Sequence, residues 1–354
     1  MPVGKLLRMR KACVVALVLL AVGVAGCRRD RNKKKGAIVR EPEGRYALTD
    51  LGTLGGREGV WLALNDAGDV AGTIRREDGT SAAAVWRTGA WATVGTLGGK
   101  NSFAADISAV GVVVGQSELA DGASVGFVSS DGRTRALGRG AVDATGINAG
   151  GAICGTAAVG ESRRAMVWEG ERVVELGTLG GSESHATGIN AGGWVVGYST
   201  AGNGETRAFV WRDGRMSALA ALGGSSGFSQ ARAINRQGWV VGESRVDAVR
   251  PHAVLWRDGG AIDLGTLDDA RPAGRSVANA VNDRGQVVGR ATRDRDFYRA
   301  FLWEKGAMVD LNDVIAPSSG WTLTAAYDVN EKGQVVGEGR MGGEARYFLL
   351  TPRE

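Results

Sequence analysis

Short apolar runs alternate with glycine-rich turns from residue 46 to the end of the chain. The runs are bounded by Gly, Asn and Asp and are too short for typical helices, so they read as strands. They come in sets of four, as in segments 185–190, 193–197, 207–211 and 216–220. The pattern predicts four-stranded antiparallel units joined by tight turns.

The units repeat along the chain around the motif I-N-x-x-G-x-V-V-G. Its first glycine falls at positions 68, 111, 151, 193, 238, 285 and 333, in steps of 40 to 48 residues. The residue three positions earlier is Asn in six copies and Ser108 in the second. Asn folds its side chain onto the backbone and Gly accepts positive φ, so N-x-x-G is a hairpin turn. Because β-helix coils have about half this period, we expect an all-β, seven-bladed β-propeller of about 44-residue, four-stranded repeats.

The two ends of the repeat region complement each other. If the strand ending in Asn is innermost, the seventh copy has strands at 325–330, 333–337 and 346–350 but no fourth strand. A spare strand of the fourth type lies at the other end, at 46–52 (YALTDLG). Pairing the two would close the ring and remove its exposed edges. The sequence therefore predicts one propeller domain over 46–354, closed by strand 46–52.

The stretch GTLGG follows that first strand and at first resembles a phosphate-binding loop. It returns intact at 95–99 and 177–181, each time before another strand-like run. A phosphate loop is expected once, before a helix N-terminus. We therefore interpret its glycines as turns from the outer strand of one blade to the inner strand of the next.

A family resemblance rests on several columns at once. RAFVW, RAFLW and RAMVW, followed by DG, an apolar strand, DLGTLGG and the Asn-Gly motif, resemble the HAF repeats of bacterial exported proteins. The resemblance covers residues 46–354 and implies an extracytoplasmic repeat protein, but brings no assigned activity. The chain departs from it at the His column, which holds His252 in one copy and other residues in six.

The N-terminus predicts export. A basic segment precedes the apolar run ACVVALVLLAVGVAG, which is short for a membrane span and ends in VAGC. This end resembles a lipoprotein lipobox, which implies a signal peptide over 1–26 and lipidation of Cys27. An ordinary secretory signal or a short anchor helix are the alternatives.

The charge is unevenly distributed. The chain carries a formal +5, yet residues 28–45 alone hold eight basic and three acidic groups. Residues 46–354 hold 31 basic and 35 acidic groups, which argues against nucleic-acid binding. We interpret 27–45 as the lipidated cysteine and a basic flexible tether lying against a membrane with anionic headgroups. We expect an exported monomer, lipid-anchored at the outer membrane or cell surface rather than the inner membrane.

Material for catalysis is scarce. The chain has two histidines, in different repeats, and Cys154 lies in an apolar strand, so we expect no metal, no cofactor and no catalytic triad. Asp106 and Asp328 share one repeat position, two before the Ser or Asn, where other copies have Ala or Gly. Two carboxylates near a propeller axis could act as acid and base on a polysaccharide, as a hydrolase or lyase. Alternatively, each is a polar strand residue bonded to backbone.

The variable connections of the last two repeats are the candidate binding face. Variable polar loops with aromatic residues on a rigid scaffold are where binding usually occurs. The candidate residues are Arg271, Arg275, Arg293, Arg295, Phe297, Tyr298 and Trp321. The favoured function is a non-catalytic binding or scaffolding propeller for a protein, peptide or glycan. The alternatives are the polysaccharide enzyme and a structural repeat without a specific ligand.

Overall fold

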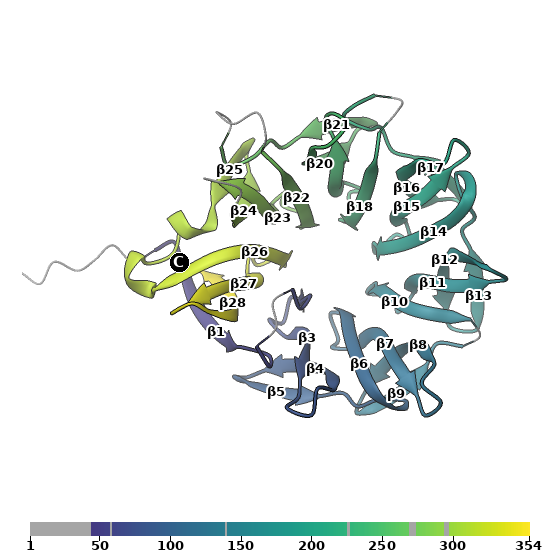
Figure 1. The fold of residues 1–354 in the computed structure, drawn as a ribbon, viewed down its shortest axis with the longest axis horizontal. Coiled ribbons are helices and arrows are strands. Elements are labelled where there is room, and N and C mark those ends of the chain that lie inside the picture. The colour runs from purple at the N-terminus through teal and green to yellow at the C-terminus, as the bar shows by residue number, and fades with distance from the viewer. Residues whose placement is uncertain (1–43, 57–58, 139, 225–226, 269–273, 294–296) are drawn as a thin grey trace, which may run out of the picture. The chain divides into compact units, whose positions relative to one another are not determined.

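Seven four-stranded antiparallel sheets, one for each sequence repeat, stand around one axis in the computed structural model (Figure 1). The structure describes residues 44–56, 59–138, 140–224, 227–268, 274–293 and 297–354. The predicted signal peptide, Cys27 and nearly all of the predicted tether lie outside these residues. No helix within the described ranges is long and apolar enough to cross a membrane.

The strands follow the predicted order, four to a blade. Blade one has β2 (Ala63–Leu64), β3 (Val70–Arg75), β4 (Ser81–Arg87) and β5 (Ala90–Thr93). Blade two has β6 (Gly98–Ile107), β7 (Val113–Leu119), β8 (Ser124–Ser130) and β9 (Arg133–Ala136). Blade three has β10 (Ala141–Ile147), β11 (Ile153–Val159), β12 (Ser162–Glu169) and β13 (Arg172–Glu175). Blade four has β14 (Gly180–Ile189), β15 (Val195–Ala201), β16 (Thr206–Arg212) and β17 (Arg215–Ala218).

The last three blades continue the series. Blade five has β18 (Ser229–Ile234), β19 (Val240–Arg245), β20 (Pro251–Arg257) and β21 (Gly260–Asp263). Blade six has β22 (Ser276–Val281), β23 (Val287–Arg293), β24 (Phe297–Glu304) and β25 (Ala307–Asp310). The 3-10 turns η1 (Leu311–Asp313) and η2 (Pro317–Ser319) lead into blade seven. That blade has β26 (Trp321–Val329), β27 (Val335–Met341), β28 (Glu344–Pro352) and β1 (Tyr46–Gly52).

Ring closure by the N-terminal strand is confirmed. Strand β1 pairs antiparallel with β28, from Tyr46 opposite Pro352 to Gly52 opposite Tyr347. The sheet order is therefore β1-β28-β27-β26, with β1 taking the outer place of a fourth strand (Figure 1). Tyr46 and Leu51 are 5% and 4% exposed, so this strand also supplies buried side chains.

The fold begins slightly before the predicted boundary. The Arg45 carbonyl accepts the Arg353 backbone N–H at 2.9 Å, and the Arg45 guanidinium pairs with Glu304 at 3.1 Å. A Cβ added to Gly44 would lie 2.4 Å from the Ile315 carbonyl carbon. The predicted tether is therefore too long at its C-terminal end, because Gly44 and Arg45 already pack on the propeller.

The GTLGG turns have the predicted role. Gly98 and Gly180 start the inner strands β6 and β14 with φ of 103° and 102°. Other residues rarely adopt these angles, because a Cβ would clash with the backbone. Each turn carries the chain from an outer strand, β5 or β13, to the next inner strand.

The core lies between adjacent blades. Phe127, Phe209, Phe301 and Phe348 occupy one repeat position on third strands and are fully buried. Phe301 of blade six, for example, packs in one cluster with Leu255 of blade five. Cys154, in the apolar strand noted in the sequence, is a free buried cysteine in a similar cluster.

Candidate functional site

A ring of asparagine side chains links the blades at the N-x-x-G turns. Within a turn the Asn side chain accepts two backbone N–H groups, as Asn190 does from Gly192 and Trp194, both at 3.0 Å. Its Nδ2 then donates to the carbonyl of the corresponding residue in the next blade. The bonds are Asn65 to Ser108, Asn148 to Asn190, Asn190 to Asn235, Asn235 to Asn282, Asn282 to Asn330 and Asn330 to Asn65. The ring is broken only between Ser108 and Asn148 of the next blade. The Ser108 hydroxyl accepts the Val112 N–H within its own turn, and the shorter serine side chain does not extend to the next blade as an asparagine amide does.

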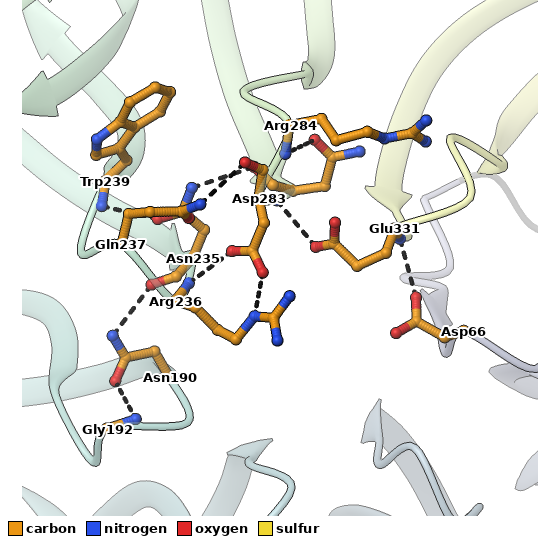
Figure 2. A network of polar contacts seen from close by, with 11 residues as sticks. Asp66, Asn190, Gly192, Asn235, Arg236, Gln237, Trp239, Asp283, Arg284 and Glu331 are labelled. Carbon is orange, nitrogen blue, oxygen red and sulfur yellow. Dashed lines mark hydrogen bonds and ion pairs between the residues drawn. The ribbon is translucent and has the colours of Figure 1, made fainter.

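A second chain of polar contacts lies beside this ring and joins four blades, five, six, seven and one. The Asp283 carboxylate accepts the Arg236 backbone N–H at 2.8 Å, and its other oxygen is bonded to the Arg236 guanidinium. Glu331 in turn accepts the Asp283 N–H, and Asp66 accepts the Glu331 N–H, both at 2.9 Å. Figure 2 shows these carboxylates reaching from blade to blade. Their oxygens already hold backbone groups, so they bind neighbouring blades together.

The axis contains a cavity of about 180 Å³, lined by inner strands from all seven blades. A β-bulge shapes it in six blades, at the residue three before the Ser or Asn of the turn. A bulge leaves one residue unpaired and changes the direction of its side chain. Thr145 and Asn279 use this freedom to donate to carbonyls of the next blade, those of Ala186 and Ala326. Arg232 and Tyr327 occupy the same bulge position and line the cavity.

Asp106 and Asp328 follow the bulge and both line this cavity, so the structure brings the two predicted carboxylates together. The Asp106 carboxylate accepts the N–H of Ile107 and that of Ile147 in the next blade, both at 2.8 Å. Asp328 accepts the N–H of Val329 and that of Leu64 in the next blade, also at 2.8 Å. Each carboxylate therefore bridges two blades through backbone bonds.

The electrostatics of the two carboxylates favour protonation. Burial raises the pKa of Asp106 to about 7, although the Ile147 N–H lowers it, and the charge on Asp328 raises it further. Burial also raises the pKa of Asp328, to about 6, against the N–H groups of Leu64 and Val329. Such values suit acid–base chemistry. However, neither carboxylate is hydrogen-bonded to another described side chain, so nothing orients one as a base and the other as an acid.

The predicted binding residues come together only in part. Arg293 and Trp321 line one pocket of about 290 Å³ together with Arg299. Tyr298 lies under the Arg290 guanidinium, with 4.7 Å from Cζ to the ring centre, and Phe297 is 63% exposed. Arg275 is exposed at the start of β22, where its backbone bonds to Thr292. Arg271 and Arg295 lie outside the described residues.

Two of these residues serve the scaffold. The Arg293 guanidinium bonds to Asp310 at 2.6 Å, and the Asp310 side chain is only 2% exposed. Removing Arg293 would leave a buried carboxylate without its partner, which is costly. Trp321 meets the buried Phe348 ring edge-on, with 6.3 Å between ring centres. Arg299 and Phe297 are freer: Arg299 donates only to the Tyr298 carbonyl, at 3.3 Å, and has no ion pair among the described residues.

A further pocket, between blades four and five, was not predicted. Its volume is about 370 Å³, and Trp194, Trp239, Arg212 and Arg257 line it. The available signal was the Trp in GGWVVG and QGWVVG, because other repeats place smaller or polar residues after the turn glycine. Among the described residues no group of three or more His, Cys, Asp or Glu side chains could hold a metal ion.

Comparisons with known proteins support the fold alone. No protein-family model and no curated protein matches the sequence. The chain is similar to the β-propeller domain of the Trilobed protease from Pyrococcus furiosus, described as having an open velcro topology. The TM-score is 0.53 at 12% identity, over 72% of this chain and 83% of that one. In contrast to that description, the present ring is closed by the β1–β28 pair.

Two peptidases are similar at the same level. A puromycin-hydrolyzing peptidase from Mycobacterium tuberculosis gives a TM-score of 0.54 at 13% identity, over 88% of this chain and 55% of that one. An acylaminoacyl peptidase from Pyrococcus horikoshii gives 0.50 at 11% identity, over 82% and 51%. The chain thus spans about half the length of each peptidase.

Proposed function

We propose that this chain is a non-catalytic binding propeller for a protein, peptide or glycan partner, held at the cell envelope by lipidated Cys27 and its basic tether. The observation that carries the proposal is the pocket of Arg299 and Trp321 beside the exposed Phe297. The resemblance to HAF-repeat proteins supports the extracytoplasmic location. The signal-like N-terminus supports the anchor.

The fold concentrates irregular chain beside this pocket. The connection from β25 to β26 contains η1 and η2, whereas the described connections of blades two and four use the short GTLGG turn. Asn312 fixes the connection by accepting the Leu323 N–H at 2.7 Å and donating to its carbonyl at 3.0 Å. A rigid wall next to an exposed aromatic side chain and an unpaired guanidinium is typical of a partner-binding surface.

The polysaccharide-enzyme alternative has less support. Its two carboxylates are adjacent to one cavity, but each is bonded to two backbone N–H groups and bridges blades. These bonds between blades are enough to explain why an aspartate stands at each position, with no need for a bound substrate. The cavity of about 180 Å³ is also smaller than the roughly 300 Å³ at which ligand pockets usually begin.

The test is partner capture by the full-length protein. Variants Phe297→Ser and Arg299→Gln, singly and combined, are compared with wild type for capture from envelope extracts, quantified by mass spectrometry. Val110→Ser is the matched control, because Val110 is 85% exposed in the Ser108–Gly111 turn at the other end of the strands. We expect the double variant to lose the partner that wild type and control retain, with little change in melting temperature. Equal capture by all variants would contradict the proposed surface.

A further inference from the structure

The unpredicted pocket between blades four and five is built from one residue pair repeated in two blades. In each pair an arginine at the end of the third strand stacks on a tryptophan at the start of the second. The Arg212 Cζ lies 5.0 Å from the Trp194 ring centre, and the Arg257 Cζ lies 5.1 Å from that of Trp239. Both pairs line the same pocket of about 370 Å³.

The indole rings hold these pairs rigidly. Trp194 packs over the turn of the next blade, where a Cβ on Gly238 would lie 2.4 Å from its ring. Trp239 packs over Gly285 in the same way, at 2.8 Å. A guanidinium stacked on a fixed indole keeps its in-plane N–H donors available, because stacking uses only its face.

In three other blades the side chains at the same two positions bond to each other. In blade one Arg87 pairs with Asp69 at 2.9 Å. In blade six Gln286 donates to Glu304 at 3.2 Å, and in blade seven Gln334 donates to Thr351 at 3.2 Å. Blades four and five differ because the partner is a tryptophan, which stacks but accepts no N–H bond. Within the described chain the guanidinium groups of Arg212 and Arg257 have no ion pair or hydrogen bond, and each contacts a tryptophan ring.

The remaining lining groups favour a polyhydroxylated ligand. Asp258 is the single acidic side chain in the lining, and the backbone of Gly259 and Gly260 also contributes. Gln237 lines the pocket and donates from its Nε2 to the Asp283 carbonyl at 3.0 Å, which leaves its Oε1 as an acceptor (Figure 2). Carboxylate and amide oxygens accept from sugar hydroxyls, while guanidinium forks bind carboxylates with two parallel bonds.

We propose that this pocket binds a carboxylated saccharide, with its carboxylate on Arg212 or Arg257 and its hydroxyls on Gln237 and Asp258. The pocket is a second binding site, separate from the surface of Phe297 and Arg299. This site lies at the opposite ends of the strands from Phe297. Loss of saccharide binding and loss of partner capture are therefore separate outcomes.

The experiment is calorimetric titration of the full-length protein with three carboxylated probes: trimers of galacturonic acid and of glucuronic acid, and sialyllactose. The methyl ester of each probe is the uncharged control of the same shape. We expect at least one acid probe to bind, its ester to bind at least about tenfold more weakly, and added salt to weaken the acid probe alone.

The variants identify the site. Arg212→Gln and Arg257→Gln should each weaken the bound probe, and the double variant should do so at least about tenfold. Arg87→Gln is the matched control at the same repeat position, already neutralised by Asp69, and should bind as wild type does. The proposal is overturned if no acid probe binds, if the esters bind equally, or if the double variant binds as Arg87→Gln does. Equal binding of triglutamate or inorganic phosphate would overturn the saccharide class.

Discussion

Asn330 donates from its Nδ2 to the carbonyl of Asn65 across 3.0 Å, joining residues 265 positions apart in the chain. The bond joins blade seven to blade one within the asparagine ring, next to the Asp328 bridge to Leu64. Side chains of the turn motif thus join blades as well as forming turns. The repeat is held together at its axis by polar contacts and between its sheets by apolar ones.

Replacing Asn330 with Ser should isolate the bond between blades. Ser108 shows that a serine at this position still accepts a turn N–H, that of Val112 at 3.0 Å. Asn330→Ser should therefore keep the turn, lose the bond to Asn65 and reduce the free energy of unfolding by about 1–2 kcal/mol. The reverse change, Ser108→Asn, should complete the ring and stabilise by about 1 kcal/mol. Chemical denaturation measures both, and destabilisation by Ser108→Asn would contradict the account of the gap.

The axial carboxylates should make the protein less stable as the pH rises. Burial raises the folded-state pKa of Asp106 to about 7 and of Asp328 to about 6, from the ordinary value of 3.8 for an aspartate. Between the ordinary pKa and the raised pKa values, the folded state keeps protons that the unfolded chain releases. The free energy of unfolding therefore falls as the pH increases through this window. The melting temperature of wild type should therefore fall more between pH 4.5 and pH 8, in buffers of equal ionic strength, than that of Asp106→Asn/Asp328→Asn.

The comparison of the two proteins isolates these groups, because all other titrating residues are common to both. The double variant loses an acceptor at each site, which lowers its stability at every pH. Only the difference in slope bears on the pKa values. Parallel pH profiles would show that the two carboxylates titrate near their ordinary values.

Two turn glycines separate backbone strain from packing. Gly193 and Gly238 have φ of 75° and 83°, but an added Cβ meets nothing within 4 Å at Gly193 and the Trp194 ring at 2.4 Å at Gly238. Gly193→Ala should cost about 1 kcal/mol, from the left-handed backbone alone. Gly238→Ala should cost clearly more, because the indole must move and Arg212 with it. Equal losses in thermal denaturation would mean that Trp194 is not held over the turn.

The closing strand should be the most sensitive seven-residue segment at the N-terminal end of the fold. Deleting residues 46–52 removes β1 with the buried Tyr46 and Leu51 and exposes the edge of β28. Each buried side chain alone is worth about 2–4 kcal/mol, so the loss should exceed about 5 kcal/mol. Deleting residues 30–36 of the predicted tether is the length-matched control and should leave the melting temperature unchanged. Similar melting of the two deletions would contradict closure by β1.

The architecture was predictable because every repeat contains the same turn and strand signals. Counting strands of each type assigned 46–52 to the last blade, and the β1–β28 register confirms that assignment. The shared repeat position of Asp106 and Asp328 likewise placed both at the axis, where one cavity contains them. Because each repeat folds into the same blade, residues at one repeat position occupy equivalent places around the axis.

The features that the repeat pattern could not predict depend on contacts between separate strands and blades. The bulge before Asp106 and Asp328 changes the register of the inner strand, and no residue type marks it. The ion pair of Arg293 with Asp310 depends on how the chain bends after β25. Trp194 reaches the turn of the next blade, a neighbour that is 44 residues away in sequence at Gly238. These contacts join positions that the alignment of repeats treats as unrelated.

The central claim is that the axial carboxylates join blades and that the protein binds without turning over its ligand. Its most direct test is incubation of the full-length protein with a panel of envelope and extracellular polysaccharides, measuring new reducing ends and unsaturated products. Asp106→Asn and Asp328→Asn, shown to be folded by circular dichroism, run in parallel. The account predicts no product above that of heat-inactivated protein in any of the three. Turnover by wild type that is lost in either folded variant would contradict it.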